Sequence, residues 1–244
     1  MRWEGGLSMG SLGTVLLVWA HPDDDIYTSA GIMAASAAEG DRVVDVTATR
    51  GEGGSMDEER WPPSTMGEVR TAELLRSLQI LGVGEHRFLD GPVDVDMQAH
   101  LDESGADQVK AIMAEVDPDT VVTFGPDGMT GHQGHKDVSR WATDAFESIA
   151  KPGARLLYAT QTPEWVAGWL PKLEPFDIFL PGSPPETPIE ELAIHFVLSD
   201  DLRDLKFRAI SAHESQVEGL MEVFGRDLMQ GLGEENFRLG GVKG

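Results

Sequence analysis

Apolar runs typical of buried strands alternate with helix patterns along most of this chain. Residues 15–19 are continuously apolar, which indicates a strand buried on both faces. Residues 26–39, rich in Ala, Ile and Met, predict a helix that ends at Gly40. Four such units predict a mainly parallel sheet with helices on both faces. The later predicted elements are strands over 42–49, 87–89, 120–124, 156–160 and 193–198, and helices over 65–81, 102–114, 136–149 and 200–212.

Local signals refine these boundaries. Thr65 and Glu68 have the spacing of a capping box, and Ser199 is a suitable N-cap for the last predicted helix. Seven prolines over residues 161–188 favour a long ordered loop or cap. The glycine-rich residues 231–244 predict a C-terminal tail with loose ends, in which Phe237 and Leu239 could dock on the core.

Length and composition describe an ordinary globular chain. Its 244 residues, 41% hydrophobic and 25% charged, predict a single domain over 1–244 with a core of about 14–216. A net charge of −23 argues against nucleic acid or an anionic membrane as partner. The chain has no cysteine, which excludes disulfides and thiolate sites. Residues 1–13 lack a signal-peptide pattern and no apolar run reaches membrane length, so a cytoplasmic location is expected. The sequence leaves the oligomeric state open, and a homo-oligomer is one alternative.

An acidic cluster, His21-Pro22-Asp23-Asp24-Asp25, directly follows the first predicted strand. Carboxylates are seldom buried unless they are paired or bind a metal, and a helix N-terminus after Pro22 would favour them. A histidine and a carboxylate three positions apart can converge on one metal ion, which leaves a neighbouring carboxylate free to act as a base. The alternative is a solvated acidic turn with an incidental histidine.

A second cluster follows the strand at 120–124, with His132 and His135 in a Gly-rich stretch. Ligands of open parallel sheets lie beyond the carboxyl ends of the strands, so both clusters meet there if the two strands are neighbours. Two histidines and one carboxylate suit Zn²⁺ with an open position for water, and Fe²⁺ accepts the same set. A water made acidic by the metal and a carboxylate that takes its proton are the parts of a hydrolase.

The Gly-rich residues 50–54 follow the second predicted strand. A phosphate loop would need G-x-G-x-x-G spacing after the first strand, and Glu52 would repel phosphate. We therefore interpret these residues as a flexible loop of the site.

These motifs together resemble the LmbE-like / PIG-L superfamily of metal-dependent N-deacetylases. The resemblance rests on His21-Pro22-Asp23-Asp24 with Gly131-His132-x-x-His135 and extends in order from about Val15 to Gln216. The supporting stretches are Thr49-Arg50-Gly51-Glu52-Gly53-Gly54, Arg70-Thr71-Ala72-Glu73 with Ile80-Leu81-Gly82-Val83, and Lys206 with Ala209, His213, Ser215 and Gln216.

The resemblance implies a Rossmann-like three-layer α/β sandwich with strand order 3-2-1-4-5. It assigns the ligands of zinc, or of Fe²⁺ or another divalent metal, to His21, Asp24 and His135. It makes Asp23 the general base, and His132 the group that stabilises the oxyanion or protonates the leaving amine. The residues expected near the substrate are Arg70, Asp127 and His213.

The expected function is removal of acetyl from an N-acetyl amino sugar or its small-molecule conjugate. Asp25 stands where the family usually has Glu, but it is no ligand, and residues 161–190 have no family match, so substrate choice is expected partly there. The alternatives are hydrolysis of another amide, a 2-His-1-carboxylate iron oxygenase, and a non-enzymatic Rossmann-type binding module. Arg70 could instead pair with Glu73 on a helix surface, and His213 could be structural.

Overall fold

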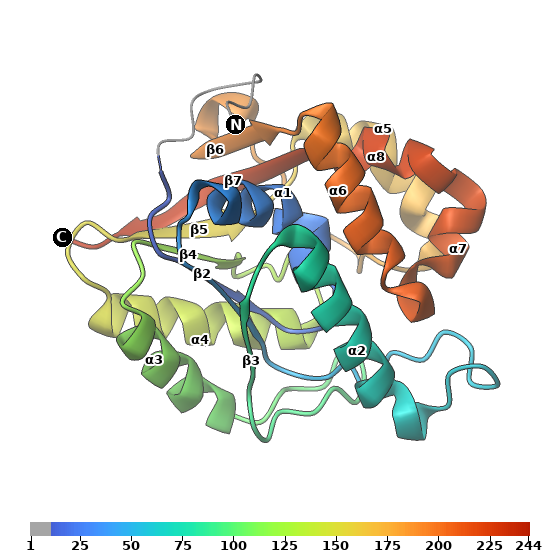
Figure 1. The fold of residues 1–244 in the computed structure, drawn as a ribbon, viewed down its shortest axis with the longest axis horizontal. Coiled ribbons are helices and arrows are strands. Elements are labelled where there is room, and N and C mark those ends of the chain that lie inside the picture. The colour runs from blue at the N-terminus through green and yellow to red at the C-terminus, as the bar shows by residue number, and fades with distance from the viewer. Residues whose placement is uncertain (1–10) are drawn as a thin grey trace.

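The computed structural model describes residues 11–244 and contains one seven-stranded sheet (Figure 1). The strand order is β3-β2-β1-β4-β5-β7-β6. The first five strands are parallel, and β7 joins β5 and β6 in antiparallel pairing. The predicted order 3-2-1-4-5 and the α/β class are therefore confirmed. The strands are β1 Val15–Trp19, β2 Val43–Thr47, β3 Glu85–Phe88, β4 Thr120–Phe124, β5 Arg155–Ala159, β6 Ile194–Val197 and β7 Glu234–Val242.

Two layers of helices cover the sheet. The helices α1 and α2 connect β1 to β2 and β2 to β3, and they pack against each other and against α6. The helix α3 connects β3 to β4, and α4 follows β4. These two helices pack against each other and, since crossovers are right-handed, lie on the opposite face. The helices are α1 Asp24–Glu39, α2 Pro63–Leu81, α3 Ser104–Val116, α4 Gln133–Ile149, α5 Pro163–Leu173, α6 Asp200–Ser211, α7 Glu214–Phe224 and α8 Leu228–Leu232, with short 3₁₀ turns η1 Glu174–Phe176, η2 Ile189–Glu191 and η3 Gly225–Asp227.

The strands β1, β2 and β4 are buried at every position, as the apolar run 15–19 predicts for β1. Because β1 pairs with both β2 and β4, its carboxyl end lies beside theirs. The strand order reverses there, since the chain passes from β1 to β2 on one side and reaches β4 on the other. This edge of the sheet holds the site described below.

The C-terminal tail is a strand and not loose, and the expected docking of Phe237 is confirmed. Residues 234–242 form β7, whose Phe237 is fully buried in the core, although Leu239 is half exposed. The glycines suit this position because a side chain at Gly240 would collide with the Tyr158 ring of β5. The sheet and core thus extend beyond residue 216.

Two further local predictions differ from the structure. The segment 161–188, expected as an ordered loop or cap and not a core element, contains the helix α5, but only Leu173 of that helix is buried. The capping box at Thr65 is absent because α2 begins two residues earlier, at Pro63, with no side-chain cap. The Ser199 cap is confirmed, since its hydroxyl accepts from the Leu202 amide.

The prediction for residues 1–13 falls almost wholly outside the described chain. Among the helices of residues 11–244, none combines the length and apolar character that a membrane crossing requires.

Candidate metal centre and active site

The first acidic cluster forms the turn from β1 into α1. Asp23 is the N-cap residue and has φ 143°, a strained value for a residue with a side chain. Asp24 opens the helix, and its Oδ2 accepts hydrogen bonds from the amides of Ala20 (3.1 Å) and His21 (2.7 Å). The backbone of the turn therefore fixes the Asp24 carboxylate beside the His21 ring.

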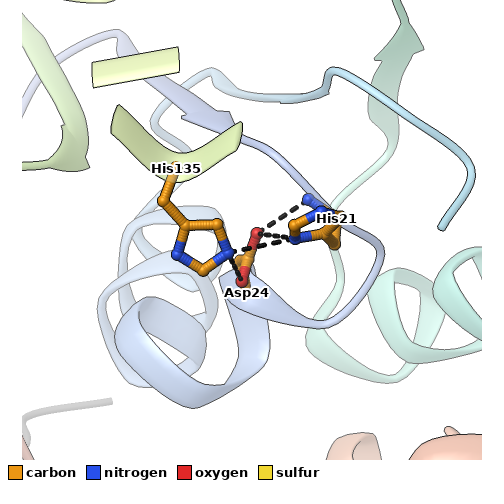
Figure 2. A group of neighbouring side chains, drawn as sticks. All are labelled: His21, Asp24 and His135. Atoms are coloured by element: carbon orange, nitrogen blue, oxygen red, sulfur yellow. Dashed lines mark hydrogen bonds and ion pairs between the residues drawn. The ribbon is translucent and has the colours of Figure 1, made fainter. Parts of the chain in front are cut away.

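The second cluster meets the first across the sheet edge. His135, in the first turn of α4, places its Nε2 3.0 Å from His21 Nδ1 and 3.4 Å from Asp24 Oδ1. His21 Nδ1 lies 3.6 Å from Asp24 Oδ2. Figure 2 shows the two rings and the carboxylate facing one another. Among the described residues, these three side chains form a group that could hold a metal ion, and they are the predicted triad.

The surroundings of His135 fix which ring nitrogen is free. Its Nδ1 lies 3.0 Å from the Gly128 carbonyl, which can only accept, so Nδ1 carries the hydrogen and Nε2 keeps its lone pair. Burial, the largest influence, holds the pKa of His135 well below its usual value. The Phe124 ring stacks on the imidazole at 4.1 Å between centroids. A neutral, oriented imidazole of this kind is typical of a metal ligand.

Arg70 holds Asp23. Its Nη2 lies 3.1 Å from Asp23 Oδ1 and donates to the Pro22 carbonyl at 3.2 Å, and the side chain is buried. Burial raises the pKa of Asp23 to about 6, although the Arg70 charge opposes the shift. The alternative pairing of Arg70 with Glu73 was wrong.

Glu73 instead binds the start of α7. Its carboxylate accepts from the Ser215 amide at 2.8 Å and from the Ser215 hydroxyl at 2.7 Å, and Gln216 donates to the Gly54 carbonyl at 3.0 Å. The late Ser-Gln pair therefore joins α7 to α2 and to the Gly-rich loop.

The Gly-rich loop encloses the Arg70 guanidinium. A β-carbon at Gly51 or Gly54 would collide with that guanidinium, and Gly51 also has φ 68°. The loop therefore belongs to the site, and its glycines leave the space that the Arg70 guanidinium occupies.

His132 is the N-cap residue of α4, with its ring centroid 5.0 Å from that of His135. Its buried Nε2 has no hydrogen-bond partner among the described residues. Burial and, secondarily, the charge of His21 lower the pKa of His132. The ring therefore faces the site with an unused polar atom.

The other two expected substrate residues lie further out. Asp127 pairs with Arg238 of β7 at 3.0 Å and accepts from the Met129 amide at 2.8 Å. His213 is fully buried with both ring nitrogens unpartnered in the described chain, and burial, helped by the charge of Arg70, lowers its pKa to about 3. Within residues 11–244, neither forms a hydrogen bond or an ion pair with the triad.

Asp94 belongs to the site and was not predicted. Its Oδ1 lies 3.6 Å from His21 Nε2, and this nearby imidazole lowers the pKa of Asp94 against the effect of burial. It lies in an irregular loop after β3, where no periodicity marks it.

The sequence is similar to those of one family of known proteins. The model of the PIG-L family, described as GlcNAc-PI de-N-acetylase, matches residues 16–146. A 1D-myo-inositol 2-acetamido-2-deoxy-alpha-D-glucopyranoside deacetylase of Saccharomonospora viridis is 32% identical, over 83% of this chain and 85% of that protein. The chain belongs to the PIG-L family. A deacetylase of the same name from Streptomyces avermitilis is 38% identical over 58% of this chain and 55% of its own length.

Solved structures support the fold of this PIG-L chain. An N,N'-diacetylchitobiose deacetylase from Pyrococcus horikoshii has a TM-score of 0.62 and 21% identity, over 93% of this chain and 83% of that one. The 4-carboxy-2-hydroxymuconate hydratase GalB of Pseudomonas putida has the same TM-score of 0.62 with 16% identity, over 95% and 98%. Since one fold accompanies two reactions, the chemistry must be argued from the site.

Proposed function

We propose that this chain is a metal-dependent deacetylase of an N-acetyl amino sugar or its small-molecule conjugate. The observation that carries the proposal is the convergence of His21 Nδ1, Asp24 and His135 Nε2 within 3.0–3.6 Å of one another. Family membership and the reaction named for the relatives agree with it.

The three side chains fit a divalent metal. His21, Asp24 and His135 each offer one ligand atom, and these atoms lie close enough together to bind a single ion. The donor set favours zinc with an open position, and Fe²⁺ is the second choice. The bound ion would polarise the amide carbonyl and make a water molecule more acidic.

Asp23 is the proposed general base. Arg70 orients its Oδ1 and stabilises its ionised form, which leaves Oδ2 to accept the proton of the attacking water. A carboxyl pKa near 6 combines an ionised majority at neutral pH with more basicity than an ordinary aspartate.

His132 is proposed to serve the other side of the reaction. Its unpartnered Nε2 would donate to the carbonyl oxygen as negative charge develops, or deliver a proton to the leaving amine. Its own burial disfavours the imidazolium, so the nearby acids Asp24 and Asp94 are needed to favour it.

Arg70, Asp127 and His213 are the proposed substrate-binding residues. For Asp94 the contact with His21 suggests a different role, since a carboxylate beside the second nitrogen of a ligand histidine orients that ring.

The test is a panel of amides assayed for acid release with the zinc-loaded protein. The panel contains N-acetylglucosamine, the N-acetylglucosaminyl inositol named for the relatives, diacetylchitobiose and N-acetylated amino acids. We expect acetate from one or more sugar amides, and none once a chelator removes the metal. Acetate from the amino acids alone would favour another amide hydrolase. An inert panel together with hydration of an unsaturated acid would favour the chemistry of the hydratase relative.

A further inference from the structure

A cavity of about 720 Å³ adjoins the proposed active site. Its wall consists of three loops, around residues 97–98, 126–136 and 180–183. Backbone hydrogen bonds join these loops, from Gln133 to the Met97 carbonyl and from Leu180 to the Thr130 carbonyl, both at 2.8 Å. Gly131 and Gln133 line the cavity on either side of His132, so the cavity opens next to the catalytic loop.

Lys136 carries an uncompensated charge in this wall. It is half-buried, yet no carboxylate among residues 11–244 forms an ion pair with it. The other charged residue of the wall, Asp127, is paired with Arg238 at 3.0 Å. The stem of Lys136 packs beside Gly128, where a β-carbon would be 2.9 Å from its Cγ.

Among the described residues that line the cavity, Lys136 is the one cation, and it is unpaired although the net charge of −23 makes carboxylates plentiful elsewhere. An ammonium kept unpaired in a cavity is suited to an anionic group that arrives with a ligand.

Lys136 is not part of the metal centre. It follows His135 directly on α4, and adjacent residues of a helix point in different directions. The His135 side chain therefore lies in the triad, whereas Lys136 lines the cavity. Its charge does lower the pKa of the neighbouring His132, an effect that would be the same for every substrate.

We infer that the cavity receives the group bonded to the amino sugar, and that Lys136 makes the enzyme prefer a negatively charged group, a carboxylate or a phosphate. The inference rests on the proposed deacetylase function and narrows its substrate class. Gln98, Gln133 and Ser183 add neutral polar groups to the wall, which suit the remaining oxygens of such a ligand.

The test compares substrates that differ only in charge. The carboxymethyl and carbamoylmethyl α-glycosides of N-acetylglucosamine are nearly isosteric, and a second pair with two more methylenes covers a longer reach. For the wild-type zinc enzyme we expect a kcat/KM about tenfold higher for the acid than for the amide in at least one pair, the order of a hydrogen bond to a charged group. Lys136→Met should abolish this preference and Lys136→Arg should keep most of it. The readout is the ratio of acid to amide, in which any common effect through His132 cancels.

Lys110 on the exposed side of α3 provides the control. Lys110→Met removes the same charge and should leave the preference intact, which separates a local effect from the total charge. Equal rates for acid and amide in both pairs would overturn the inference while leaving the deacetylase function standing. The inference would also be overturned if Lys136→Met lowered kcat/KM equally for the acid and the amide, because Lys136 would then act through His132. If neither these glycosides nor N-acetylglucosamine release acetate, the proposed function itself has failed.

Discussion

Asp45→Asn is expected to change how the free energy of unfolding depends on pH. The substitution should destabilise the protein near pH 4 and stabilise it at pH 7. Asp45 lies in the middle of β2 and is fully buried. Its Oδ1 has no hydrogen-bond partner in the described chain, and its Oδ2 lies 3.5 Å from the Thr47 hydroxyl and 3.7 Å from His86 Nε2. His86 supplies no cation, because burial lowers its pKa to about 4.

Burial raises the pKa of Asp45 from 3.8 to about 8. The folded chain therefore keeps a proton that the unfolded chain releases above pH 3.8, so ionisation favours unfolding increasingly from about pH 4 to pH 8. At pH 7 the unfolded state gains about 4 kcal/mol in this way, at about 1.4 kcal/mol per pH unit. Asparagine does not ionise, but its buried amide lacks partners, which costs about 1–3 kcal/mol. The variant should therefore be more stable than wild type by about 1–3 kcal/mol at pH 7 and less stable near pH 4.

Urea unfolding at pH 4.5, 6.0 and 7.5, with a chelator present throughout, measures this crossover. Asp144→Asn removes one charge from the exposed side of α4 and serves as the control, for which we expect no crossover. A variant that is less stable than wild type by the same amount at every pH would refute the reasoning, because Asp45 would then not titrate between pH 4 and 8.

Three further changes probe the site. Asp23→Asn should keep the metal but lower kcat about a hundred- to ten-thousandfold, since an amide cannot accept the proton; near-full kcat would place the base elsewhere. His132→Ala should retain zinc, lower kcat far more than it raises KM, and remove one limb of the pH–rate profile, whereas loss of zinc would make His132 a ligand. Gly51→Ala should lower the free energy of unfolding in urea by at least about 1 kcal/mol, because alanine disfavours the left-handed backbone at this position. It should also lower kcat, because the new β-carbon displaces Arg70; an unchanged kcat would show that the loop has no part in catalysis.

The parallel core was predictable because its strands are buried on both faces. Residues 15–19 are a continuous apolar run, and residues 120–124 are β-branched or aromatic, which suits strands of a covered sheet. The turn after β1 was also predictable, since four polar residues directly after such a strand must lie at its carboxyl end.

The C-terminal third was harder because its stability comes from distant partners. The charged Glu235 of β7 is buried only because Lys206 of α6 lies 2.9 Å away and the amides of Gly31 and Ile32 donate to it. Likewise α7 begins where Glu73, 142 residues earlier, binds Ser215. No local pattern contains these pairs.

The same reason explains the errors within the site. Arg70 and Glu73 have the spacing of a helix pair, but both are buried, and Arg70 binds the turn before α1 whereas Glu73 binds the start of α7. Asp94 reaches His21 from a segment with no regular structure, so only the folded chain brings them together. The motif histidines needed no such information, because adjacent strands carry them.

The central claim is a metal held by His21, Asp24 and His135. Its most direct test is the zinc content of the purified protein beside that of the His21→Ala/His135→Ala double variant. His100→Ala is the control, since His100 is an exposed histidine paired with Asp137. The account predicts about one zinc per chain in wild type and control and almost none in the double variant. Zinc that persists at wild-type content without both histidines would contradict it.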